Sequence, residues 1–592
     1  MESKHASVGS LKRSPSLTWL RSPERGRYRS PLIAALLALG GAVGPIAPPI
    51  LESPETILHG GRIYTVDVAR PWAEAMAIEA GKIVAVGDDT EVLGLRRRTT
   101  EIIDLDGRMV LPGFHDPHVH VVEGGVNERL CLLPWRRPLA TYEQSARNCA
   151  NRQQSRDWVV GAGVFLSTLL EGDELPIDVL DRAVPDRPAL ILDDLGHGAW
   201  ANTLAMAAAE YGKRSPDPAG GLLHRDAGSG RLTGIVFENA QQKLRDAAWP
   251  PTDENLEETY QGLIGSLAEL NMHGITSVSD AGGYWTRGHH DVWARAEGRG
   301  ELTVRASNAL YVSPDRPFEA QMADLRRLYA NEPGSLLRFN QAKIYIDGIL
   351  DLGTSALLNP YLASASLPSP SPSGFVYFEQ HVLQEYVRAL DEIGFQMHLH
   401  ATGDRGVRLA LDALEAARAR NGAADRRHRV SHLYLVDEED RPRFLELGVI
   451  ADLQMPPDAI NRAYARYVSR LVGDDVAGGL LPVQSLLDAG AKTVLSSDWD
   501  AGPLSPLGTI QRALTRFAEP VGTLAGAIRM LTLDAAFLLH QADITGSIMV
   551  GKQADLVVLE RNLFDIPKTQ IEDVRVLLTL LNGEKVFRAG GF

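Results

Sequence analysis

The chain has 592 residues, 44% of them hydrophobic and 23% charged, so it can bury a large core and is not a disordered chain. This length exceeds what one compact core usually holds, which predicts a barrel with a large insertion or a second domain. The net charge of −15 argues against nucleic acid as a partner, because nucleic-acid-binding proteins usually carry a basic face.

Residues 1–50 differ in composition from the rest. A polar, basic stretch ends at Arg29, and an apolar run from Pro31 to Ala47 follows. This run is shorter than the roughly 20 residues of a membrane-spanning helix, and its pattern is typical of a secretory signal. We therefore expect a signal-like or disordered segment in an exported or membrane-anchored protein, with transient membrane contact through the apolar run. A cytoplasmic protein with an overlong start is the alternative.

Both ends of the remaining chain show short alternating runs broken by turn signals. Gly60-Gly61 and Asp106-Gly107 interrupt such runs near the N-terminus, and Asn582-Gly583 does so near the C-terminus. Alternation with these dipeptides is typical of antiparallel hairpins. We expect residues 51–112 and 545–592 to form one composite β-sandwich from both termini.

The middle of the chain, 113–544, alternates strand-like and helix-like segments, which is the pattern of βα units around a parallel sheet. Helices are predicted at 405–420 and 438–446. Eight strands predict an α/β fold of the (β/α)₈ barrel type, whose active site lies at the carboxyl ends of its strands. The predicted strands are 110–120, 275–280, 305–312, 341–347, 396–401, 429–434, 449–454 and 493–498.

Residues of about 122–262 do not fit this repeat and are predicted to form an insertion over the barrel mouth. They hold further short strands at 158–163 and 189–194. A polar loop that contains His197 follows the second of these strands. A substrate role and a structural hydrogen bond are both open for His197. Cys131 and Cys149 fit no zinc-finger pattern, and the sequence leaves open whether they pair.

Chemically active side chains stand at the ends of the predicted barrel strands. His118 and His120 are two residues apart on a strand, so both imidazoles can face one point. Imidazole is the commonest metal-ligating side chain, although two solvated histidines on a surface strand are the alternative. The other strands carry Lys343, His398, His400, His432 and Asp498.

These residue types suit metal-assisted hydrolysis. Imidazoles with a carboxylate bind zinc, and also manganese, iron or nickel. A bound metal lowers the pKa of its water to about 7, and a nearby carboxylate can take the proton and later give it to a leaving amine. A buried lysine has a lowered pKa, and its free amine can take up carbon dioxide as a carbamate that bridges two metals. An ion pair of Lys343 with Asp347 or Asp351 is the alternative.

Six stretches carry a resemblance to a known family: GFHDPHVH, AKIYIDG, HLHATGDRGVRLALDALE, HRVSHLYLVD, SSDWDAGPLSP and GSIMVGKQADLVVLE. They resemble the amidohydrolase superfamily, and most closely its YtcJ-like branch, amidohydrolase family 3. The resemblance runs from about Pro54 to the C-terminus. It implies a (β/α)₈ barrel, a composite β-sandwich from both termini, and metal-dependent hydrolysis, usually of a C–N bond.

Carried over by position, the resemblance also implies a ligand set. The implied ligands are His118, His120, Lys343, His400, His432 and Asp498, with Lys343 carbamylated in many relatives and Asp498 also the catalytic acid and base. His398, two residues before His400 on the same face of the strand, is not an implied ligand and is expected to lie next to the ligands. Asp116, Asp347 and Asp404 are candidates for orienting a ligand, and a turn or cap role is the alternative for each.

The sequence thus predicts a hydrolase of amide-type bonds in a small-molecule substrate, with one or two divalent metals, zinc first. A lactonase or esterase would use the same residues, and a non-catalytic binding protein on this barrel would normally lack some of them. The substrate and the oligomeric state stay open, and a homo-oligomer is one option.

Overall fold

The computed structural model describes residues 54–171, 174–365, 367, 369, 371–457 and 460–592. The chain divides into two compact units, Met1–Leu51 and Glu52–Phe592, and the prediction for residues 1–50 lies outside the described residues.

In the second unit, eight parallel strands of the described chain form a sheet in the order β21-β20-β19-β18-β17-β16-β15-β8. Its edges approach each other, since the Asp498 backbone N donates to the His118 carbonyl at 2.9 Å. The predicted (β/α)₈ barrel is therefore confirmed as a nearly closed barrel. Its strands are β8 (Phe114–Val119), β15 (Ile275–Gly283), β16 (Arg305–Tyr311), β17 (Leu337–Tyr345), β18 (Gln396–Ala401), β19 (Arg429–His432), β20 (Ile450–Gln454) and β21 (Thr493–Ser496).

The longer helices between these strands bury an apolar stripe. In α12 (Asp404–Asn421), Val407, Leu411 and Leu414 recur at helical spacing and are buried. This helix ends before Gly422, whose φ of 86° few other residues adopt readily. Among the described residues, no helix is both long and apolar enough to cross a membrane. The other helices of this layer are α8 (Asp253–Met272), α9 (His289–Gly298), α10 (Phe318–Leu328), α11 (Gln380–Ile393), α13 (Arg441–Leu447), α14 (Arg462–Val472), α15 (Asp474–Ala477), α16 (Val483–Asp488), α17 (Pro506–Thr515), α18 (Leu524–Met530) and α19 (Leu533–Leu538).

The predicted strand 110–120 is two strands that belong to different sheets. β7 (Met109–Pro112) pairs with β22 (Leu556–Leu559), whereas β8 enters the barrel. Gly113 lies at the junction, and a Cβ added there would be 2.3 Å from Thr276 Oγ1. Only glycine fits this close approach, so the chain passes from one sheet to the other at this point.

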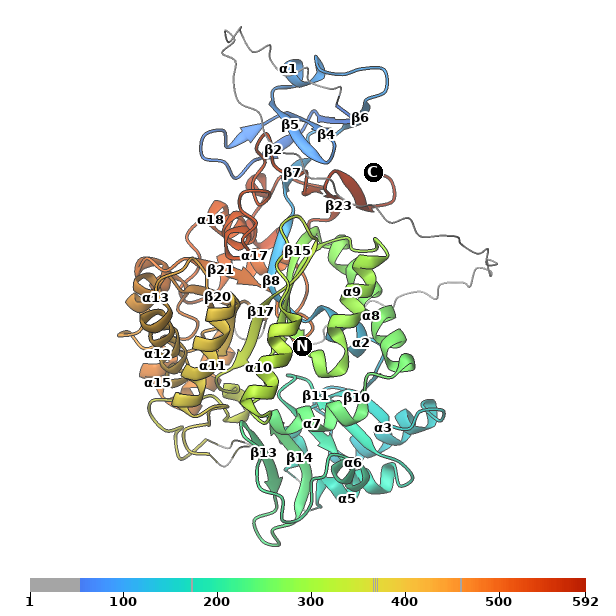
Figure 1. Ribbon diagram of the computed structural model, residues 1–592, viewed down its shortest axis with the longest axis vertical. Helices are drawn as coiled ribbons and strands as arrows, with labels where there is room; N and C mark the ends of the chain where they lie inside the picture. The colour runs from blue at the N-terminus through green and yellow to red at the C-terminus, as the bar shows by residue number, and fades with distance from the viewer. Residues whose placement is uncertain (1–53, 172–173, 366, 368, 370, 458–459) are drawn as a thin grey trace, which may run out of the picture. The chain divides into compact units, whose positions relative to one another are not determined.

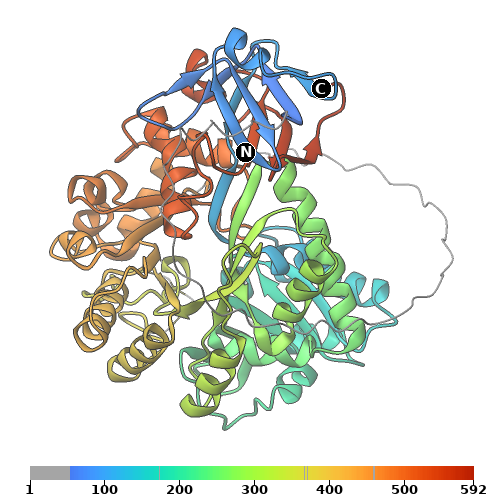
Figure 2. The same ribbon diagram turned by 45° about the horizontal axis from the view of Figure 1, so that its top comes forward.

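Strands from both ends of the chain lie side by side in one sheet, in the order β24-β23-β22-β7-β2-β3 (Figure 2). Its remaining strands are β2 (Arg62–Tyr64), β3 (Trp72–Ala73), β23 (Val576–Leu581) and β24 (Glu584–Arg588). A second sheet, β5-β4-β1-β6, uses β1 (Thr56–His59), β4 (Ala75–Glu79), β5 (Lys82–Gly87) and β6 (Glu101–Asp104), with the short helix α1 (Asp89–Leu93) beside it. Leu58, Met76, Val110 and Leu580 belong to one buried cluster, which joins the two sheets.

The insertion builds its own sheet, in the order β13-β14-β12-β11-β10-β9, at the end of the barrel away from the terminal sheets (Figure 1). The ends of the predicted range, 122–262, lie in α2 (Val121–Asn127) and α8, which pack so closely that a Cβ on Gly125 would be 2.2 Å from the Gly262 carbonyl oxygen. The elements between are β9 (Cys131–Leu132), α3 (Leu139–Arg152), β10 (Val159–Val164), α4 (Leu166–Leu169), α5 (Pro176–Ala183), β11 (Ala189–Asp193), β12 (Gly198–Ala201), α6 (Thr203–Ala208), β13 (Gly221–Arg225), β14 (Leu232–Glu238) and α7 (Asn239–Ala248).

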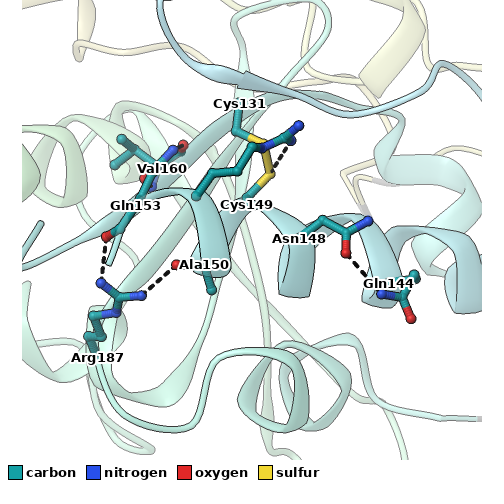
Figure 3. Close-up of a disulfide and its surroundings, with 9 residues drawn as sticks. Cys131, Gln144, Asn148, Cys149, Ala150, Gln153, Val160 and Arg187 are labelled. Carbon is teal, nitrogen blue, oxygen red and sulfur yellow. Dashed lines mark hydrogen bonds between the residues drawn. A yellow bond between two sulfur atoms is a disulfide. The ribbon is translucent and has the colours of Figure 1, made fainter. Parts of the chain in front are cut away.

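A disulfide between Cys131 and Cys149 ties β9 to α3 within this insertion (Figure 3). Both cysteines are buried. Arg187 fixes the end of the same helix, because its guanidinium donates to the Gln153 carbonyl at 2.6 Å and to the Ala150 carbonyl at 2.8 Å. The structure thus resolves the pairing that the sequence left open.

Candidate metal centre and active site

The predicted ligands meet at the carboxyl ends of the barrel strands. Nε2 of His118 and Nε2 of His120 lie 3.3 and 3.4 Å from the same carboxylate oxygen, Asp498 Oδ1. His432, at the end of β19, has its Nδ1 3.9 Å from Asp498 Oδ2, and its ring centre is 4.1 Å from that of His400 on β18. Strand order therefore brings together residues that are up to 380 positions apart.

Lys343 is the cation in the middle of this cluster. Its side chain is 1% exposed, and its Nζ lies 3.0 Å from His118 Nε2. Burial lowers the pKa of Lys343 to about 7, against the opposing charge of Asp498. Among the charged groups acting on Lys343, Asp498 has the largest effect on its pKa, and an ion pair with Asp347 or Asp351 stays the alternative prediction.

Several buried polar side chains next to His118 fix the orientation of its ring. His118 Nδ1 lies 3.1 Å from His398 Nε2 and 3.7 Å from Asp452 Oδ2. The fully buried Arg429 donates in turn to His398 Nδ1 at 2.5 Å. Nδ1 of His118 is thus engaged, which leaves Nε2 towards Lys343 and Asp498.

His120 is oriented from α2 by a carboxylate that sequence analysis missed. Glu123 Oε2 lies 2.9 Å from His120 Nδ1, and its other oxygen accepts from Arg245 at 2.5 Å. Burial alone would raise the pKa of Glu123, but Arg245 and His120 hold it well below its usual range. The signal that could have found it is its position one helical turn after His120.

Asp498 stands just after β21 and faces the ligands. Burial alone would raise its pKa, yet the hydrogen bond with His120 and the nearby His432 and Lys343 keep it lowered, so the group is a carboxylate at neutral pH. Asp116 holds the strand ends beside it, since its Oδ1 accepts from the Ser497 backbone N at 3.1 Å. Asp116 therefore positions the Asp498 loop.

The other aspartate candidates act on backbone rather than on ligands. Asp347 accepts 2.9 Å hydrogen bonds from the backbone N atoms of Thr402, Gly403 and Ala356, which fixes the loop after His400. Asp404 accepts from the Leu358 backbone N at 2.9 Å. For both, the turn or cap alternative describes their contacts.

The insertion adds His197 to the site. Its ring centre is 5.1 Å from that of His400, and its Nδ1 lies 2.6 Å from Glu238 Oε2. Burial works against its charge, but Glu238, Asp193 and Asp498 together raise its pKa above the usual value. Glu238 lies 41 residues from His197 and carries no local signal, so the sequence does not reveal it.

The donor set fits a divalent metal. His432 Nε2 is buried and has no hydrogen-bond partner among the described residues, as expected of an atom reserved for a metal. Its group with His118 and Asp498 places one candidate ligand atom of each residue within 4.8 Å of the others. A second such group, His118 with His398 and Asp452, contacts the cationic Arg429, which disfavours another cation there.

A pocket of about 110 Å³ opens onto this cluster. Its polar wall includes His197, His400, His432 and Asp498. Its apolar wall is formed by Leu195, Ile349, Leu350, Tyr434, Pro456 and Ala501. A small apolar group can therefore lie next to the ligands.

Known proteins share this architecture. A model of the Amidohydrolase family matches residues 101–587. The chain is 28% identical over 550 residues to an N-substituted formamide deformylase of Arthrobacter pascens, covering 89% of this chain and 97% of the relative. It is 27% identical over 558 residues to a putative amidohydrolase, YtcJ, of Bacillus subtilis, covering 90% and 99%. The crystal structure of an uncharacterized metal-dependent hydrolase of Pyrococcus furiosus shares the fold with a TM-score of 0.66 and 23% identity, covering 86% and 99%.

The barrel, the ligand cluster at its strand ends and the family match define a metal-dependent hydrolase of the amidohydrolase type. The chain belongs to the amidohydrolase family, and its relatives include the YtcJ protein. The resemblance seen in its sequence is confirmed.

Proposed function

We propose that this protein hydrolyses amides with a small apolar acyl group, with His118, His120, Lys343, His400, His432 and Asp498 holding one or two divalent metals, zinc first. The observation that carries the proposal is the convergence of both Nε2 atoms of the first-strand histidines on Asp498 Oδ1. The relative named N-substituted formamide deformylase supports an amide substrate.

In this proposal Asp498 moves the protons. A divalent metal held by these residues would acidify a water and polarise the carbonyl. Asp498 accepts one proton from the attacking water on a carboxylate oxygen as the water oxygen bonds to the carbonyl carbon. It gives the proton to the nitrogen as the C–N bond breaks, so the products are a carboxylic acid and an amine.

A substrate panel tests the reaction class. The metal-loaded protein is assayed with N-alkyl and N-aryl formamides and acetamides, and with the matching esters and a lactone. We expect turnover of amides, with activity falling as the acyl group outgrows the pocket. Hydrolysis of esters or lactones without any amide turnover would replace the proposal with a C–O hydrolase.

The role of Asp498 is tested by Asp498→Asn. We expect metal content to change little and kcat to fall by about 10²- to 10⁴-fold, the usual contribution of a positioned acid–base group. Asp500→Asn is the matched control, because that carboxylate contacts Asn127 at 2.6 Å instead of the ligands. Near-normal turnover in Asp498→Asn contradicts the proposed role.

We propose that Lys343 carries a carbamate that bridges two metals. Its lowered pKa supports this, because only the neutral amine takes up carbon dioxide. Elemental mass spectrometry should find about two metals per chain with bicarbonate and fewer without it. Lys343→Ala should lose metal, and added acetate should restore part of it; unchanged metal content and activity in this variant contradict the carbamate.

We also infer that the protein works in an oxidising compartment. The Cys131–Cys149 disulfide supports this, because such bonds persist outside the cytosol and are rare within it. The test is thiol labelling and N-terminal sequencing of the native protein from its source. A cytosolic protein with both thiols free and its N-terminus at Met1 would contradict the inference.

A further inference from the structure

One imidazole from the insertion faces the reaction site without being a candidate ligand. His197 lies between β11 and β12 and lines the same pocket as His432 and Asp498. Its ring centre is 5.1 Å from that of His400 and 6.0 Å from that of Tyr345. A group in this position can touch a substrate bound at the ligands.

A buried carboxylate holds this imidazole from behind. Glu238 is 1% exposed, and its Oε2 meets His197 Nδ1 at 2.6 Å. The carboxylate also accepts from Tyr377 Oη at 2.8 Å and from Thr354 Oγ1 at 2.6 Å. Three donors from separate segments thus fix Glu238, and Glu238 fixes which ring nitrogen of His197 remains for the pocket.

The backbone around both residues is held as firmly. The Glu238 backbone N donates to the His197 carbonyl at 2.8 Å, so the two residues are joined twice. Gly198 N donates to Asp193 Oδ1 at 2.9 Å and Gln241 Nε2 donates to the Gly196 carbonyl at 2.7 Å, which fixes the loop on either side. Glu238 itself has φ 55° and ψ −130°, an unfavourable backbone conformation that tends to persist at functional sites.

We propose that His197, held by Glu238, donates a hydrogen bond from Nε2 to the carbonyl oxygen of the substrate and stabilises its negative charge as water adds. This rests on the proposed amide hydrolysis. Asp498 groups with His118 and His120, whereas the His197 ring lies beside that of His400, so the proposed proton transfer and charge stabilisation use different side chains of the pocket. The insertion thereby supplies a catalytic residue that the barrel lacks.

The test compares His197→Ala and His197→Gln with His224→Ala as the matched control. His224 is also an insertion histidine, but it lies on β13, and its Nδ1 contacts Thr233 Oγ1 at 3.0 Å. Two assays are made on metal-loaded protein: steady-state kinetics with one amide, which give kcat and KM, and calorimetry, which gives the affinity for ethyl methylphosphonate. This anion imitates the tetrahedral form of the substrate.

For His197→Ala we expect kcat to fall by about 10²- to 10³-fold with KM little changed, as for loss of one oxyanion donor. Phosphonate affinity should fall about 10- to 100-fold, the loss expected for a hydrogen bond to a charged group. Metal content should be unchanged. His197→Gln should recover part of both losses, because its amide N–H can still donate, and His224→Ala should match the wild type.

The inference is overturned if His197→Ala keeps its kcat and its phosphonate affinity, or if His197→Gln recovers neither. Wild-type protein that binds no phosphonate also overturns it. A wild type that hydrolyses no amide but binds phosphonate through His197 would refute the proposed substrate and leave His197 as the anion-stabilising group. Glu238→Gln provides a second variant: loss of kcat at constant metal content supports the pair, and no change argues against it.

Discussion

Glu123→Gln tests whether a group that never touches the metal governs its binding. Glu123 serves two donors, His120 Nδ1 at 2.9 Å and Arg245 at 2.5 Å, with one oxygen for each. Glutamine has one oxygen and one NH₂ group, so in either orientation an N–H faces another donor. A hydrogen bond to a charged group contributes about 1.5–3 kcal/mol. We therefore expect metal affinity to fall by about 10- to 100-fold, the range known for partners of ligating histidines.

The assay is competition with a chelator at pH 7, followed by elemental mass spectrometry. The folded-state pKa of Glu123 is below its unfolded value, so its stabilising contribution is present above the unfolded value and is lost only as pH falls through the folded one. At pH 7 Glu123 is therefore ionised, and the assay measures the contribution of its carboxylate to metal affinity. Glu257→Gln, an exposed carboxylate on α8 bonded to Arg295 at 2.6 Å, is the control. Equal metal affinity in Glu123→Gln and the control would refute the reasoning.

Three further substitutions probe the interior. Arg429→Met leaves buried Asp452 without its cation and should lower the free energy of unfolding of metal-free protein by about 3–5 kcal/mol; an unchanged denaturation midpoint argues against this. Cys131→Ser should cost about 3 kcal/mol, and reductant should then destabilise only the wild type, which parallel thermal melts with and without reductant would show. Gly124→Ala would place a Cβ 2.6 Å from the Trp499 ring beside the catalytic loop, so kcat should fall at constant metal content; normal steady-state kinetics contradict this.

The barrel strands were predictable because short strand-like runs alternate with helical stretches along the chain, which is the pattern of βα units around a parallel sheet. β18 (Gln396–Ala401) has the bounds predicted. The prediction of one strand over 110–120 missed the split at Gly113, although Pro112-Gly113 is a turn signal in the sequence. The close approach of Thr276, which is distant in sequence, explains why glycine is needed at this junction.

The candidate ligands were predictable from strand ends, whereas the groups that orient them were only partly so. Glu123 has helical spacing from His120 and carries a local signal. Glu238 carries none, since its partners His197, Thr354 and Tyr377 come from three separate segments. Sequence reveals groups whose geometry a single element dictates, and it misses groups that depend on how the insertion packs against the barrel.

The charge of the cluster links the structure to the proposed carbamate. A metal-ligating site is positive once loaded, and among its six candidate ligands Asp498 is the carboxylate. An ammonium on Lys343 would add a further positive charge 3.0 Å from His118 Nε2 and would oppose metal binding. A neutral amine removes that repulsion, and a carbamate reverses its sign and supplies a bridging anion for a second metal. The buried position that lowers the pKa of Lys343 to about 7 therefore favours the neutral amine that the proposed carbamate requires.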